Sequence, residues 1–314
     1  MTSHPMQIQD ELLQMPEWHR LAEIRQFSLS LVLFQRNAAE LVVLIGRFRT
    51  GPAAIEIWGL PSRPKLEEFQ IEVTRLVHNF VAASLSLVGH ARRFYEKNYR
   101  NNKLFEDYEY KVKTLFAEDP LCQFVQGLRN YCLHKELPDV SSSLTFGEGQ
   151  DIKHSISLVK KSILDFDWNL KARQFLDSAL DEIDLLDTVN QYAGKVTDFY
   201  NWVFSRLEEI HAEDIKAVEK KQQELREAIA ERTPNDLLAQ LNIFEQIPFP
   251  PEDMFLQFID PKKWGEIRDY SENPIERANA FFNYVEGFAP RVSPLRDQVV
   301  EAFKAFYKSG QKGK

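Results

Sequence analysis

The chain has 314 residues, of which 44% are hydrophobic and 27% are charged, and its formal net charge at pH 7 is −8. This composition excludes wholesale disorder, and the negative charge argues against a protein that coats nucleic acid indiscriminately. The 12 glycines are few for this length, so long helices are favoured over many short strands.

Residues 1–64 predict an N-terminal helical region that ends in a connector. Between residues 27 and 48, apolar residues recur every three or four positions, as in a helix, although the run FSLSLVLF alternates as a strand does. Arg36 and Glu40 interrupt this apolar stretch, so no membrane span is expected. The first residues lack the pattern of a signal peptide. We therefore expect a cytoplasmic protein, with the Gly- and Pro-containing residues 49–64 as the connector.

Residues 65–232 predict the main helical bundle. Apolar stripes predict helices in its first half over 65–103, 104–117 and 121–138, the last ended by its proline. Asp119-Pro120 is the expected start of that last helix.

A β-hairpin is expected at about 141–158, where short β-compatible runs flank the Gly-containing residues 147–150. Helices resume near Asn169 and continue, with Ile183 among their apolar residues, as far as Leu207. The highly charged residues 207–232 then predict a helix that is either solvated or lies against a partner helix. The sequence TPNDLL is expected to end it.

Residues 233–314 predict a C-terminal helical extension. The run IPFPPEDMF indicates an extended, proline-fixed link. The sequence SENPIERANAFFNYVEGF predicts a short capped helix, and SPLRDQVVEAFKAFYKSGQKGK a final helix with a basic tail. The whole chain is thus expected to be mostly all-α, with one small hairpin.

Two cysteines, Cys122 and Cys132, lie ten residues apart. That spacing is too long for a disulfide within one straight helix, and two cysteines alone do not form a structural zinc site. We expect two buried free thiols and no metal or other cofactor.

The string LRNYCLHKELP contains three residues that suit RNA cleavage: Arg129, Asn130 and His134. The nucleophile in such a reaction is the 2′-hydroxyl of the RNA, so the protein needs to move protons and neutralise phosphate charge. Histidine exchanges protons near neutral pH, and arginine offers forked donors to phosphate oxygens. No metal is required for this chemistry.

Helical spacing places these residues unequally. Asn130 and His134 are four apart and share a face, whereas Arg129 and His134 are about 140° apart. We expect Asn130 to hold the imidazole while Arg129 reaches round from the flank. His134 is in the last turn, where the helix dipole stabilises a cation. Two copies meeting across a two-fold axis would place two such pairs around one groove.

The same spacing recurs at Arg206 and His211, so it arises here by chance at least once. Glu208 and Glu209 flank that second copy, and their charges would repel a phosphate. We interpret it as a solvated helix face and assign it no function.

The string GLRNYCLHKELP, near the end of a predicted helix, resembles the motif of HEPN domains, and residues 65–207 are the part that the resemblance covers. The segments DFDWNLKARQFL and TDFYNWVF also resemble a bacterial group of HEPN-like proteins. The resemblance implies an antiparallel α-helical bundle, and in many members a metal-independent ribonuclease that acts as a homodimer. It places the site at Arg129, Asn130 and His134. The N-terminal region, the hairpin and the C-terminal extension depart from the shorter stand-alone domains of that family.

A basic cluster with interleaved tyrosines precedes the motif. It is a candidate RNA track, and the alternative is a solvated helix end. Its cations are Arg92, Arg93, Lys97, Arg100 and Lys103. His78 and His90, which lie in an apolar helix, are interpreted as packing residues.

Two hypotheses follow. The first is a cytoplasmic HEPN-like ribonuclease that binds RNA as a homodimer, in phage defence or a toxin-like response, with a protein inhibitor as a further possible partner. The second is a non-catalytic helical protein that serves dimerisation or binds a protein or nucleotide partner, which the acidic balance and the charged residues 207–232 favour.

Overall fold

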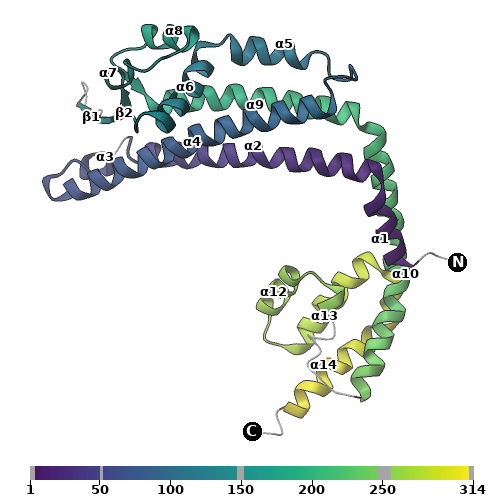
Figure 1. Ribbon diagram of the computed structural model, residues 1–314. Helices are drawn as coiled ribbons and strands as arrows, with labels where there is room; N and C mark the ends of the chain where they lie inside the picture. The colour runs from purple at the N-terminus through teal and green to yellow at the C-terminus, as the bar shows by residue number, and fades with distance from the viewer. Residues whose placement is uncertain (1–3, 50–51, 147–151, 247–255, 311–314) are drawn as a thin grey trace. The chain divides into compact units, whose positions relative to one another are not determined.

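The computed structural model describes residues 4–49, 52–146, 152–246 and 256–310, and it is mostly helical with a small antiparallel sheet (Figure 1). The predicted mostly α-helical class is therefore confirmed. The chain forms two compact units. Unit 1 comprises residues 1–19 and 213–314, and unit 2 comprises residues 20–212. This division differs from the expected boundaries at residues 64 and 232.

Unit 2 is built on three long helices, which run side by side in Figure 1. They are α2 (Pro16–Arg47, with its first residues in unit 1), α4 (Arg63–Asn98) and α9 (Leu185–Ile210). The shorter helical elements are α3 (Pro52–Glu56), a 3₁₀ turn (Leu60–Ser62), α5 (Tyr108–Val112), a π-helical turn (Lys113–Ala117), α6 (Pro120–His134), α7 (Lys160–Ile163) and α8 (Leu170–Ser178).

An aromatic cluster joins the three long helices. The rings of Phe34, Phe80 and Tyr192 lie within 6 Å of one another, with centroid distances of 5.7, 5.9 and 5.8 Å. All three side chains are at least 98% buried. Since α2, α4 and α9 each supply one ring to this core, the N-terminal region is not a separate domain.

Two of these helices, α2 and α4, are long and apolar enough to cross a membrane by length and composition alone. Both contribute buried residues to the core of unit 2, including Leu41 and Val73. The run FSLSLVLF is helical throughout, so its alternation does not mark a strand. Its buried residues, Phe27, Leu31 and Phe34, instead follow the helical period.

The sheet of unit 2 has the order β1-β2-β3 and is antiparallel. Strands β1 (Val140–Phe146) and β2 (Ile152–Val159) pair with Val140 opposite Leu158, which confirms the hairpin. The turn expected at 147–150 lies outside the described residues. Strand β3 (Glu182–Asp184) was not predicted.

The prediction that Ile183 is helical was wrong, because that residue pairs with Leu158 in the sheet and is 4% exposed. The helix cannot include it, since Asp184 caps α9: its carboxylate accepts a hydrogen bond from the Asp187 amide at 2.8 Å. A similar cap starts α6 as predicted, with Asp119 accepting from the Cys122 amide at 2.9 Å.

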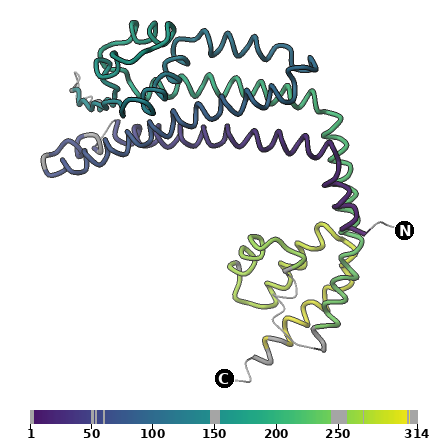
Figure 2. Tube along the Cα trace, viewed as in Figure 1, coloured from purple at the N-terminus to yellow at the C-terminus, as the bar shows by residue number. Residues whose placement is uncertain are grey.

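Unit 1 contains α1 (Pro5–Gln14), α10 (Ala212–Gln246), α12 (Pro261–Tyr270), α13 (Pro274–Phe288) and α14 (Arg296–Gly310). Two 3₁₀ turns, Leu256–Phe258 and Pro290–Leu295, complete its described elements. The expected capped helix is α13, with Asn273 as its cap, whereas α12 was not predicted. The proline-containing link at 247–255 and the tail after 310 lie outside the described residues, drawn grey in Figure 2.

The charged helix α10 lies against α1 (Figure 2), as one of the two predicted alternatives requires. Glu11 and Lys221 form an ion pair at 2.6 Å, and His4 contacts Arg232. The prediction that TPNDLL ends the helix was wrong, because α10 continues through Pro234. Leu237, beyond that proline, is fully buried among the aromatic residues of α13 and α14. Burial of the last turns outweighs the cost of one proline.

Candidate functional site

The three motif residues lie in the last turns of α6 and differ in exposure. Arg129 is half-buried, while Asn130 and His134 are exposed to solvent. The Arg129 guanidinium donates a hydrogen bond to the Asn130 Oδ1 atom at 3.1 Å. Asn130 therefore holds the arginine, and the expected hydrogen bond from Asn130 to the imidazole is not formed. Among the described residues, the His134 side chain has no hydrogen-bond partner.

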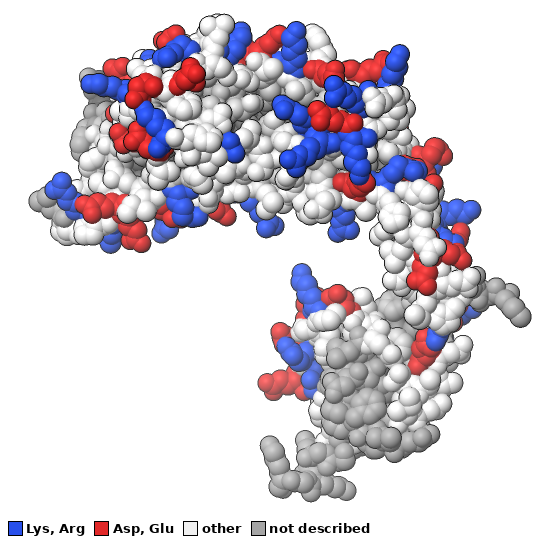
Figure 3. All heavy atoms as spheres, viewed as in Figure 1, with Lys and Arg blue, Asp and Glu red and all other residues white. Residues whose placement is uncertain are grey.

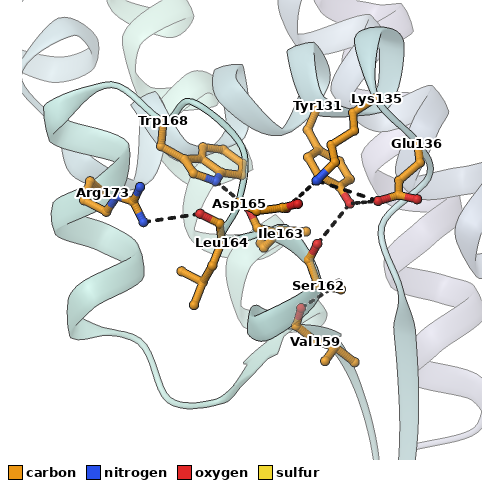
Figure 4. Close-up of polar contacts among 10 residues, drawn as sticks. All are labelled: Tyr131, Lys135, Glu136, Val159, Ser162, Ile163, Leu164, Asp165, Trp168 and Arg173. Atoms are coloured by element: carbon orange, nitrogen blue, oxygen red, sulfur yellow. Dashed lines mark hydrogen bonds and ion pairs between the residues drawn. The ribbon is translucent and has the colours of Figure 1, made fainter.

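The end of α6 is fixed to the segment that follows the hairpin (Figure 4). Tyr131 and Lys135 point from the helix toward this segment, and Lys135 forms an ion pair with Asp165. The Tyr131 hydroxyl lies 3.0 Å from a Glu136 carboxylate oxygen and 3.2 Å from the Ser162 carbonyl. These contacts hold the motif in place without using any of the three candidate catalytic side chains.

Close packing against an indole ring fixes α6 further along its length. A Cβ atom on Gly127 would lie 2.6 Å from a ring carbon of Trp168, so only glycine fits there. The Trp168 ring stacks on Phe124 at 5.3 Å, and its Nε1 atom donates to the Ile163 carbonyl at 2.7 Å. The glycine that precedes the motif thus has a packing role.

Charge and burial give the supporting side chains fixed protonation states. Burial, followed by the hydrogen bond to Glu136, raises the pKa of Tyr131, so this phenol remains a neutral donor. The hydrogen bond from Lys135, together with its charge, lowers the pKa of Asp165 and keeps that carboxylate ionised. Neither group is placed to exchange protons with a substrate near neutral pH.

The basic cluster does not form one track. Around α4, Arg93 is about 100° and Lys97 about 140° from Arg92, so these side chains diverge. Lys97 pairs with Glu23 of α2 at 2.7 Å, and Arg100 lies 3.9 Å from Glu96. Lys103 lies beyond the end of the helix with a positive φ of 57°. On the face of unit 2 drawn in Figure 3, basic side chains are interspersed with acidic ones.

The second arginine–histidine pair is not the solvated face that its sequence predicts. His211 is 9% exposed, and its Nε2 atom lies 2.8 Å from the Tyr99 hydroxyl. Arg206 forms an ion pair with Glu209. Both residues are thus part of the packing at the end of α9. Of the other histidines, His90 contacts Ser30 at 2.6 Å, and His78 is half-buried on α4.

Sequence reasoning missed His154, which is 1% exposed on β2. Its Nδ1 atom lies 3.0 Å from the Phe48 carbonyl, and its Nε2 atom is buried with no hydrogen-bond partner. Burial lowers the pKa of this imidazole. The signal was available, because His154, Ile156 and Leu158 alternate along the strand and therefore point to the same face.

The two cysteines are free, as predicted, with Cys122 buried and Cys132 half-buried. Burial raises the pKa of Cys132 to about 11 and that of Cys122 further, so neither is a thiolate at neutral pH. Within the described part of the chain, no three His, Cys, Asp or Glu side chains are grouped so as to hold a metal ion.

No family model, curated protein or solved structure matches the chain. The resemblance to HEPN domains therefore depends on the motif and its place at the end of α6.

Proposed function

We propose that this protein is a metal-independent, HEPN-like endoribonuclease. One observation carries the proposal: Asn130 and His134 are solvent-exposed beside Arg129, at the end of a helix that other residues hold in place. A surface site of this kind leaves an arginine and a histidine available to RNA. The acidic net charge of −8 makes binding depend on this local site rather than on the whole surface.

In the proposed reaction, the 2′-hydroxyl of the RNA attacks the adjacent phosphorus atom. The hydroxyl loses its proton, and the bond from phosphorus to the 5′-oxygen breaks. The products are a 2′,3′-cyclic phosphate and a 5′-hydroxyl, which takes up a proton. His134 transfers a proton as general acid or base, and Arg129 stabilises the phosphate charge. Asn130 orients the guanidinium through its 3.1 Å hydrogen bond.

A second copy of the chain is part of the proposal. One copy presents its arginine and histidine on an open surface, and a copy opposing it across a two-fold axis would supply the other wall of a groove. Two exposed cations of the basic cluster, Arg93 and Lys103, remain candidate RNA contacts away from this site. A cytoplasmic location and a role in phage defence or a toxin-like response belong to the same proposal.

The test is incubation of mixed RNA with the protein in excess EDTA, with single-stranded DNA as a control substrate. We expect RNA cleavage by the wild type and a loss of about 10²–10⁴-fold in Arg129→Ala and His134→Ala. His19→Ala, which changes an exposed histidine in α2, is the matched control and should keep full activity. Activity that disappears with EDTA, or that survives both motif substitutions, would overturn the proposal.

The alternative function is a non-catalytic dimerisation or partner-binding protein. It is supported by large apolar side chains that α2 leaves exposed, among them Leu33 at 60% and Val43 at 69%. Under this alternative, Leu33→Lys lowers the apparent mass in sedimentation, and Arg129→Ala has no enzymatic effect. Wild-type protein that is monomeric at high concentration would exclude dimerisation by this face.

A further inference from the structure

Unit 2 contains a cavity of about 530 Å³ among α4, α5, the π-helical turn, α6 and α9. This volume lies within the range of small-molecule sites in proteins. The cavity lies at the opposite end of α6 from His134, because its α6 residues are Gln123 and Gln126. It is therefore distinct from the proposed ribonuclease site.

The floor of the cavity is aromatic. Tyr95 and Tyr108 stack with their ring centroids 4.2 Å apart, and Phe116 and Phe199 meet edge to face at 5.0 Å. Tyr95 and Tyr108 are only 8% and 7% exposed, yet neither hydroxyl has a hydrogen-bond partner among the described residues. Both tyrosines line the cavity, so their hydroxyls are available to a bound molecule.

Charged side chains line the rim of the cavity, and only some of them form ion pairs. Arg100 lies 3.9 Å from Glu96, and Lys113 lies 3.6 Å from Glu118. Arg92, also on the rim, has no ion pair with a described residue and lies close enough to Tyr108 for its charge to act on that phenol. An unpaired guanidinium beside a buried apolar floor is suited to an anionic group.

The wall formed by Lys113–Ala117 is a π-helical turn, and its residues Lys113, Phe116 and Ala117 line the cavity. π-Helical turns are rare in proteins, and those that occur are frequently found at functional sites. Here the irregular backbone and the two tyrosines meet at the same cavity.

We propose that this cavity binds a small organic anion with an apolar body. The apolar body packs on the aromatic floor, where Tyr95 and Tyr108 donate hydrogen bonds to its polar atoms. The acidic group lies at the rim against Arg92. This binding is independent of the proposed ribonuclease activity.

The test uses anilinonaphthalene sulfonate, an apolar anion whose fluorescence rises in apolar sites, titrated into the full-length protein. We expect saturable binding at one site per chain. Decanoate should displace the probe, whereas decyltrimethylammonium, which has the same chain length and the opposite charge, should not.

Arg92→Gln should raise the Kd of the probe about tenfold by removing a charge-assisted contact. Arg93→Gln is the matched control, because Arg93 follows Arg92 in the sequence but does not line the cavity. This substitution should leave the Kd of the probe unchanged.

Two substitutions test the location. Val88→Trp should fill the cavity from α4 and abolish saturable binding, and Ala117→Trp should cover it from the π-helical turn. Thermal unfolding of each variant verifies that it is folded, and Ala117 is exposed, so its substitution is tolerated even if Val88→Trp misfolds. Equal binding by wild type and both folded tryptophan variants would overturn the proposal. Displacement by the cationic amphiphile, or equal effects of Arg92→Gln and Arg93→Gln, would overturn the charge assignment.

Discussion

At the scale of single residues, the buried imidazole of His154 links stability to pH. Its pKa is lowered in the folded protein because burial disfavours the charged form. Above the unfolded pKa of about 6.5 the imidazole is neutral in both states, so its protonation does not affect stability. As pH falls below that value, the unfolded state takes up the proton first, so the free energy of unfolding decreases by at most about 1.4 kcal/mol per pH unit.

We therefore expect urea unfolding of the wild type to show a loss of stability between pH 7 and pH 5, and His154→Phe to show a smaller loss. His19→Ala, at an exposed histidine, should keep the wild-type pH dependence. An unchanged slope in His154→Phe would contradict the assignment.

Gly127 gives a second prediction at this scale. An added methyl group would lie 2.6 Å from the Trp168 ring, which is itself buried at 6% exposure and cannot move freely. Gly127→Ala should therefore lower the free energy of unfolding by about 1–3 kcal/mol. Gly89→Ala is the matched control, because nothing lies within 4 Å of its added Cβ. That change should stabilise α4 by about 0.5–1 kcal/mol, measured by denaturant unfolding. Destabilisation of similar size in both variants would rule out the steric argument.

At the scale of elements, α10 shows how burial overrides a local signal. Pro234 lies inside the helix and has no N–H to donate to the carbonyl of Ala230, four residues earlier. Pro234→Ala should restore a backbone hydrogen bond and raise the stability of unit 1 by about 1–3 kcal/mol. Pro261→Ala, in the first position of α12 where a proline removes no bond, should change stability little. Calorimetry would test this, and equal shifts would contradict it.

The elements also show which parts of the fold can be predicted from sequence. Helix α6 was predicted well because a cap and a proline mark its start within a few residues. Strand β3 was not predicted, because three residues are too few to show an alternation of apolar and polar side chains. The strand forms through its pairing with β2. The site follows the same rule. The positions of Arg129 and His134 on α6 came from helical spacing, but the hydrogen bond from Arg129 to Asn130 is a choice of rotamers that spacing does not determine.

At the scale of the whole molecule, the units have separate cores. The described core of unit 2 runs from Phe27 to Leu207, and that of unit 1 is drawn from residues 237–303. Each unit therefore has a hydrophobic core of its own, as a domain that folds independently does. We expect a fragment of residues 20–212 to unfold cooperatively on heating, followed by circular dichroism, and to keep the wild-type affinity for the fluorescent anion. A fragment without a cooperative transition would show that unit 2 requires unit 1.

The pairing of α1 with α10 has a consequence for synthesis of the chain. Glu11 leaves the ribosome first, but its partner Lys221 follows about 200 residues later, which at 5–20 residues per second is about 10–40 s. During that interval Ile8 and Leu12, which are buried in the finished protein, have no partner surface from α10. All of unit 2 is made before α1 can dock. The buried face of α1 is therefore left uncovered by α10 until most of the chain has been made.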